Sequence, residues 1–212
     1  MGLRRGRYRW GMSENFPFKH IEEGALQAYK WSLNRIKWDL EHADSELSGD
    51  AIDFSNLIHA AAHLRLVIEN TVFAGLFSNR QLLLEAEKNL SAKRDMGDTR
   101  KLIRKVNPHY WPRGQRPPEN GDTKVALEPH PDALGEDEYS REWGNLSRLL
   151  HGQNPYLVKT ETPSEVLESQ LRLSERLHAT LDFHFIYLPS GEILYGRIIG
   201  ESEQVQMLQT GN

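Results

Sequence analysis

Apolar residues recur along the first long segment of the chain at the spacing of one helix face. Between about Phe18 and Leu47 they follow a 4-3-4-3-4 rhythm, at Tyr29, Leu33, Ile36, Leu40, Ala43 and Leu47. This periodicity predicts a long amphipathic helix with a coiled-coil-like seam. Trp31 and Trp38 fall on the opposite side, with Arg35 between them. That second face has three interpretations: packing at the centre of a bundle, a stacking platform for nucleic-acid bases, or a dimer seam.

The next helical segment, from about Phe54 to Ser78, is apolar on nearly all sides, which predicts a buried central helix. Its polar residues matter because a buried polar group without a partner is costly. Arg65 and Glu69, four residues apart, are expected to pair along this helix. His59 and His63 have the spacing of two helical metal ligands, but the sequence offers no obvious third ligand nearby. We therefore expect buried, hydrogen-bonded histidines, and we predict neither a metal ion nor another cofactor.

The remaining segments predict further helices and a small sheet. Helical patterns cover about Gln81–Asn89, Thr99–Val106, Glu136–His151 and Thr162–Asp182. Six of the ten prolines lie between residues 107 and 132, which excludes regular helix there and predicts a long loop. From His184 to Leu208 the pattern changes to the short strands of a β-meander.

These elements together predict an all-α fold, a helical bundle with a small C-terminal antiparallel β-meander. Three divisions follow along the chain. Residues 1–15 form a basic, mobile arm, residues 16–183 form the bundle with its Pro-rich loop at 107–132, and residues 184–212 form the meander packed on the bundle. So small a sheet needs the helices beside it for stability.

The composition narrows the class of protein further. The 212 residues are 38% hydrophobic and 26% charged, as in globular proteins. No apolar run approaches the length of a membrane span, and the basic arm lacks the apolar segment of a secretory signal. Cysteine is absent, which excludes disulfides and thiolate chemistry. We therefore expect a cytoplasmic protein that makes no membrane contact.

The net charge of −4 conceals a strong asymmetry along the chain. Residues 88–116 hold nine Lys and Arg against two acidic residues, whereas residues 119–138 hold seven acidic residues against one Lys. Either these two segments compensate one another in solvent, or the first one faces a polyanion such as RNA.

The predicted helix that ends near His151 carries the candidate chemistry. Arg141, Asn145 and Arg148 lie on one stripe at spacings of four and three residues, and His151 follows one turn later, before Gly152. Metal-free RNA cleavage needs a group that accepts and donates protons near neutral pH, a role suited to histidine. It also needs fixed cations on the phosphoryl oxygens, a role suited to arginine. The alternative is a cationic helix end that favours the negative pole of the helix dipole, with Gly152 as its cap.

Several of these features together resemble HEPN-type helical proteins of bacteria, over roughly residues 18–182. The resemblance rests on the long first helix, the Leu64-Arg65 and Ile68-Glu69 pairs of the second, and the Asn107-Pro-His-Tyr-Trp-Pro112 segment. It also rests on the late Leu146 to Pro155 stretch, which contains Leu-x-x-x-x-His-x-x-Asn-Pro.

This resemblance implies metal-independent RNA cleavage by an arginine and a histidine that lie a few residues apart, often across a dimer. His151 corresponds to the motif histidine and would be the general acid and base. Arg148 and Arg141 would clamp the phosphate, and Asn145 would position it. Only two residues separate Arg148 from His151 and nine separate Arg141 from it, where the family has four to six after a polar residue.

The expected function is therefore that of a HEPN-like, nucleic-acid-associated homodimer, an endoribonuclease of bacterial defence or toxin–antitoxin systems. The expected partners are RNA, a second copy of the chain, and a protein bound through Trp31 and Trp38 or through the 107–132 loop. The alternative function is a non-catalytic module for protein interaction or dimerisation that has kept the fold without the motif.

Overall fold

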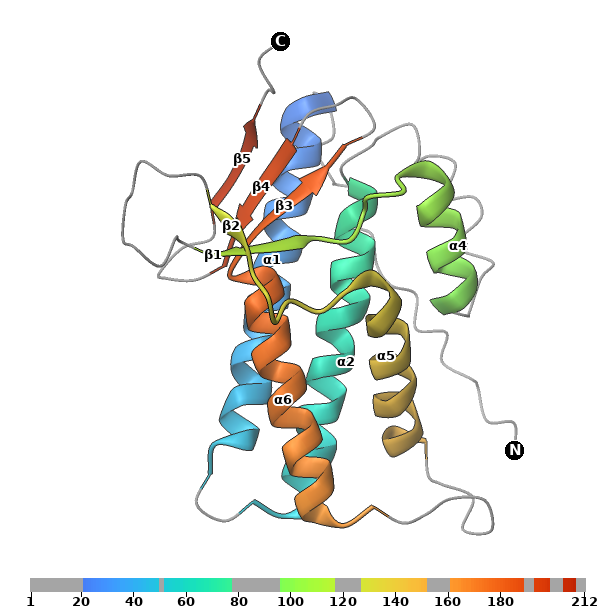
Figure 1. The fold of residues 1–212 in the computed structure, drawn as a ribbon, viewed down its shortest axis with the longest axis vertical. Helices are drawn as coiled ribbons and strands as arrows, with labels where there is room; N and C mark the ends of the chain where they lie inside the picture. The colour runs from blue at the N-terminus through green and yellow to red at the C-terminus, as the bar shows by residue number, and fades with distance from the viewer. Residues whose placement is uncertain are drawn as a thin grey trace, which may run out of the picture.

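A computed structural model describes residues 21–49, 52–77, 96–116, 127–151, 161–188, 193–198 and 204–208. It is mostly helical, with a small antiparallel sheet at one end, as Figure 1 shows. The helices are α1 (Ile21–Leu47), α2 (Phe54–Phe77), α4 (Met96–Val106), α5 (Glu136–Leu150) and α6 (Pro163–Leu181). The predicted arm at 1–15 and the predicted helix at 81–89 lie outside the described residues.

Helices α1 and α2 form the centre of the molecule and make the most extensive contact between any two elements described. Helix α6 crosses in front of both, and α5 lies against α2 on its other side (Figure 1). The predicted seam of α1 is confirmed, since every one of its residues is at most 3% exposed: Tyr29, Leu33, Ile36, Leu40, Ala43 and Leu47. The apolar sides of α2 and α6 close the core around this seam.

The second face of α1 differs from one of its interpretations. Trp31 is 58% exposed and Trp38 is 43% exposed, so packing at the centre of the bundle is wrong for these two side chains. The reason is that α2 and α6 both cover the seam side of α1, which leaves its opposite side at the surface.

The sheet contains more strands than the C-terminal pattern predicts. Strands β3 (Phe183–Tyr187), β4 (Ile193–Arg197) and β5 (Gln204–Leu208) form the predicted meander. Strand β1 (Arg113–Arg116) adds to its β3 edge, and the two-residue β2 (Glu128–Pro129) adds to β1, giving the antiparallel order β2-β1-β3-β4-β5. The predicted loop at 107–132 therefore supplies two strands, although residues 117–126 lie outside the description.

Close packing explains how a polar strand joins the sheet. Gly114 of β1 lies so near α6 that a Cβ there would overlap the carbonyl oxygen of Ala179, so only glycine fits. Arg113 and Gly114 pair with Phe185 and His184 of β3. Because the Arg-Gly-Gln-Arg sequence lacks apolar alternation, β1 is held by this register and by contact with α6 rather than by strand propensity.

The segment that precedes β1 is a structural joint. The buried Asn107 donates from Nδ2 to the carbonyl oxygen of Tyr187 at 3.0 Å, which fixes the end of α4 to β3. The hydroxyls of Tyr110 and Tyr139 are 2.6 Å apart, and the Trp111 ring stacks on Tyr139 with centroids 4.2 Å apart. Burial raises the pKa of Tyr110 far above its ordinary value, so its hydroxyl stays neutral. The aromatic residues of this segment thus fasten α5 to the sheet end of the bundle.

Candidate functional site

Helix α5 positions all the residues that the sequence nominates for phosphodiester chemistry. It begins after Gly135 with three acidic residues in its first turn, where carboxylates complement the positive pole of the helix. It ends at His151, whose backbone N–H donates to the carbonyl oxygen of Ser147 at 3.1 Å. Gly152, the predicted cap, lies outside the described residues. The described end of the helix thus places His151 at the surface, one turn beyond Arg148.

The predicted stripe of Arg141, Asn145 and Arg148 is assembled around one carboxylate, that of Glu142. Arg141 donates from Nε and Nη2 to Glu142 Oε1 at 3.1 and 3.0 Å, and Asn145 donates from Nδ2 to Glu142 Oε2 at 3.1 Å. Arg148 in turn donates to the side-chain oxygen of Asn145. The structure therefore brings these three residues together, but the charge of Arg141 is already opposed by a carboxylate.

His151 lies instead beside an arginine of another helix. Arg65 of α2 places Nη1 3.3 Å from His151 Nε2. Since a guanidinium only donates, Nε2 accepts this bond, which assigns the ring proton to Nδ1 in the neutral imidazole. Arg65 and His151 are far apart in sequence and meet only because α5 packs along α2.

Two further side chains hold Arg65 in place. Its Nε donates to Glu69 Oε1 at 2.8 Å, which confirms the predicted pairing along α2. Trp143 of α5 donates from Nε1 to the same oxygen at 2.8 Å, and the Arg65 guanidinium lies 4.8 Å from the centre of the Trp143 ring. The guanidinium is thus fixed by a carboxylate and an aromatic face, with its Nη1 directed at His151.

Arg65 is the residue of this site that sequence reasoning missed. The spacing to Glu69 suggested a core ion pair, yet both side chains keep roughly a quarter of their surface exposed. The available signal was a pair of charged residues on a helix that is otherwise apolar on nearly all sides. A partially exposed arginine fixed beside an exposed histidine can bind a phosphate oxygen while the imidazole exchanges a proton.

His184 occupies a closed site elsewhere in the molecule. It is fully buried, its Nδ1 lies 2.8 Å from the carbonyl oxygen of Leu181, and its Nε2 lies 2.5 Å from the hydroxyl of Tyr29. Burial lowers the pKa of His184 to about 4, so the ring is neutral, donates from Nδ1 and accepts at Nε2. With both nitrogens occupied and no solvent access, this histidine holds β3 to α1.

His178 of α6 has the opposite electrostatics. Its Nδ1 lies 3.0 Å from Asp182 and its Nε2 lies 2.8 Å from Asp44 of α1. These hydrogen bonds, first to Asp182 and then to Asp44, raise the pKa of His178 to about 10. Burial acts to raise the pKa of Asp44, but the bonds from His178 and Ser174 outweigh it and lower that pKa. The imidazolium is therefore a permanent cation at neutral pH that joins α6 to α1.

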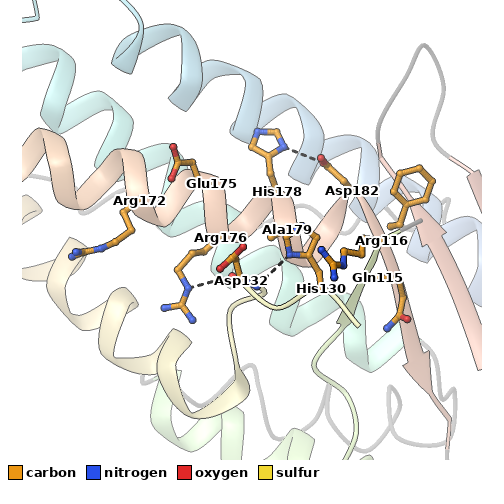
Figure 2. A pocket seen from close by; sticks show the side chains of 11 residues that line it. Gln115, Arg116, His130, Asp132, Arg172, Glu175, Arg176, His178, Ala179 and Asp182 are labelled. Atoms are coloured by element: carbon orange, nitrogen blue, oxygen red, sulfur yellow. Dashed lines mark hydrogen bonds and ion pairs between the residues drawn. The ribbon is translucent and has the colours of Figure 1, made fainter. Parts of the chain in front are cut away.

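A groove of about 670 Å³ lies along α6, bounded by β1 and the turn at 130–132. Figure 2 shows Glu175 and His178 on one flank of α6 and Arg172 and Arg176 on the other. Its cations already have carboxylate partners in several cases: Arg176 lies 2.5 Å from Glu138, and His178 bridges two aspartates. The groove contains none of the residues nominated on α5 and does not favour an anion.

Two further searches bear on the predicted class of protein. Within the described ranges, no group of three or more His, Cys, Asp or Glu side chains is placed to hold a metal ion. Among the helices that the structure describes, none combines the length and apolar character needed to cross a membrane.

Comparison with known proteins adds nothing to this geometry. No family model, curated protein or solved structure matches the chain.

Proposed function

We propose that this chain is a HEPN-like, nucleic-acid-associated protein that cleaves RNA without a metal ion, in the cytoplasm of a bacterium. A role in defence or in a toxin–antitoxin pair follows from the same resemblance. The observation that supports the proposal is the 3.3 Å separation between Arg65 Nη1 and His151 Nε2. The family resemblance implies an arginine and a histidine working together, and here they are supplied by α2 and α5.

The chemistry at this pair is that of an RNA phosphodiester. His151 accepts the proton of the ribose 2′-hydroxyl as its oxygen attacks the neighbouring phosphorus, and the protonated ring then gives that proton to the departing 5′-oxygen. Arg65 stays protonated and stabilises the charge that builds on the two non-bridging oxygens. The products are a 2′,3′-cyclic phosphate and a free 5′-hydroxyl, so the step balances without a metal or another reactant.

The stripe on α5 has a supporting role in this proposal. Arg148 is exposed one turn before His151 and would contact the adjacent phosphate. Asn145 would position that phosphate through its bond to Arg148. Arg141 contributes least, because Glu142 and Glu138 both lie within 4 Å of its guanidinium. In a homodimer, a second copy of His151 would supply a second proton donor.

Cleavage of a mixed RNA pool in EDTA by the pure full-length protein tests this proposal. His151→Ala should lower the rate by roughly 100- to 10,000-fold, and Arg65→Gln by about 100-fold, because each removes a group that acts in the transition state. His109→Ala, at an exposed histidine of the 107–112 segment, is the matched control and should cleave normally. Retained cleavage in His151→Ala would remove that residue from the mechanism.

A second candidate function has an observation of its own, the exposure of Trp31 and Trp38 on α1. Exposed tryptophans are enriched where proteins bind one another. A non-catalytic interaction or dimerisation module would use this face, and the wild-type protein would then leave the RNA pool intact. Capture of a specific protein that is lost in Trp31→Ala would support this function instead.

A further inference from the structure

The outer face of α1 and α2 carries a group of side chains around Trp38 that the proposed function does not use. The centroid of the His42 ring lies 3.8 Å from that of Trp38, and the His63 ring of α2 lies 5.4 Å from both. A buried carboxylate, Asp39, lies beneath them with no exposed surface. We call Trp38, Asp39, His42 and His63 the α1/α2 histidine cluster.

Asp39 fixes the orientation of His63. The carboxylate accepts bonds from Arg35 at 2.9 and 3.3 Å and from Asn70 at 3.4 Å, and it lies 3.0 Å from His63 Nδ1. A carboxylate only accepts, so the proton of the neutral His63 ring is assigned to Nδ1. The nitrogen left with a lone pair is Nε2.

His42 is fixed in the same way by the backbone. Its Nδ1 lies 2.7 Å from the carbonyl oxygen of Trp38, which again assigns the ring proton to Nδ1. Neither His42 nor His63 makes a hydrogen bond through Nε2 to any residue that the structure describes. His42 is exposed and His63 keeps 21% of its side chain exposed, so solvent solutes reach this pair.

Two histidines with Nδ1 bound to an acceptor and Nε2 left open have the outer shell of metal ligands. Two imidazoles on one tetrahedral ion, with bonds of about 2.0–2.1 Å, place their ring centres about 5 Å apart. The two rings here are 5.4 Å apart. We infer that His42 and His63 together bind a divalent transition-metal ion of the Zn²⁺ class, at a site separate from the proposed RNA centre.

The surrounding charges are compatible with such an ion. Arg35, the cation in contact with the cluster, has its charge opposed by Asp39. Glu46 lies one turn beyond His42 and is 3.5 Å from His59, so a carboxylate and a third imidazole are close along the same face. The described chain supplies two ligands, so water or a second copy of the chain fills the remaining positions. Those two sources predict different stoichiometries, one ion per chain or one ion per two chains.

Calorimetric titration of the full-length protein with Zn²⁺ tests the site, with Mg²⁺ as the ion that imidazole ligands disfavour. His42→Gln and His63→Gln should each abolish Zn²⁺ binding. Asp39→Asn should weaken it by about 10- to 100-fold, because Asp39 supports a ligand from the outer shell. His42 is exposed, so His42→Gln tests the site without touching the core. His59→Gln is the matched control on the same face and should bind normally.

A second readout comes from Trp38, which lies against His42. Cu²⁺ bound there should quench its fluorescence, and Trp38→Phe should remove that part of the quenching. Binding that survives in His42→Gln but is lost in His59→Gln would assign the ion to the His59 and His63 pair and overturn the inference. The same holds for a wild-type protein that fails to bind Zn²⁺. RNA cleavage in EDTA is measured separately, so neither result affects the proposed function.

Discussion

His184 and His151 show how differently one side chain behaves at two places in this molecule. His184 is sealed between α1 and the sheet, with both ring nitrogens occupied. His151 stands at the open end of α5, and its described side-chain contact is the guanidinium of Arg65. The first arrangement leaves no site for a substrate, whereas the second leaves a nitrogen and a cation in reach of solvent.

The difference shows that saturation of hydrogen bonds, more than the type of residue, separates a structural histidine from a functional candidate. Four predictions break or sharpen this comparison, and they follow in order of decreasing effect.

Closing the His184 site further should break it. A Cβ at Gly196 would overlap His184 Nε2, so Gly196→Ala forces the buried ring out of place. We expect a loss of about 3 kcal/mol in the free energy of unfolding, from urea titration, since overpacked cores lose amounts of this order. Gly144→Ala in α5 meets no atom within 4 Å and should stabilise by about 0.5–1 kcal/mol. Equal effects of the two changes would contradict the packing described.

Removing one partner of His184 should cost less. Tyr29→Phe deletes the hydroxyl that donates to Nε2 and leaves a buried acceptor unsatisfied. The expected loss is about 2 kcal/mol of unfolding free energy, because the ring nitrogen keeps its desolvation penalty. Tyr195→Phe on β4, at a partly exposed tyrosine, is the control and should change stability little. A neutral Tyr29→Phe would mean that water or a shifted ring satisfies His184.

The charged His178 sharpens the comparison through its pH dependence. Its pKa rises from 6.5 to about 10 on folding, so its stabilisation is fully present below pH 6.5 and is lost as pH rises toward 10. His178→Gln should cost about 1 kcal/mol at pH 6, a modest amount because the side chain is over one-third exposed. The cost should shrink toward zero near pH 10. Unfolding of both proteins at each pH measures this, and the titration of His184, common to both, cancels.

The smallest effect concerns the open site and identifies which arginine acts there. Arg141→Ala should leave RNA cleavage within about twofold of wild type and change stability by less than about 0.5 kcal/mol, as for exposed ion pairs. The reason is that Glu142 already opposes its charge. Cleavage lost in Arg141→Ala but kept in Arg65→Gln would return the phosphate to the stripe on α5.

The long helices were predictable because each carries a local pattern. The seam of α1 and the nearly uniform apolar sides of α2 depend on periodicity within one segment, and the structure places both in the core. The start of α6 was equally legible, since Thr162 and Glu165 form a reciprocal cap around Pro163. Strands β3 to β5 also followed from local alternation and turn signals.

What escaped prediction depends on contacts between distant segments. Strand β1 has no strand-like pattern and exists because Gly114 fits against α6 and pairs with β3. Arg65 entered the candidate site only through the packing of α5 on α2, which no local spacing encodes. The exposure of Trp31 and Trp38 likewise depended on which side of α1 the other helices cover.

The position of β1 in the sheet has a consequence for how the chain matures. Its partner β3 is synthesised only after α5 and α6 have left the ribosome, so the edge of β1 waits unpaired while the α1/α2 hairpin can already form. Contacts between distant segments form late because the intervening chain must first be closed into a loop. A chaperone that holds the nascent chain would therefore find its target in the segment around Gly114, and truncation before β3 would leave that segment without its register.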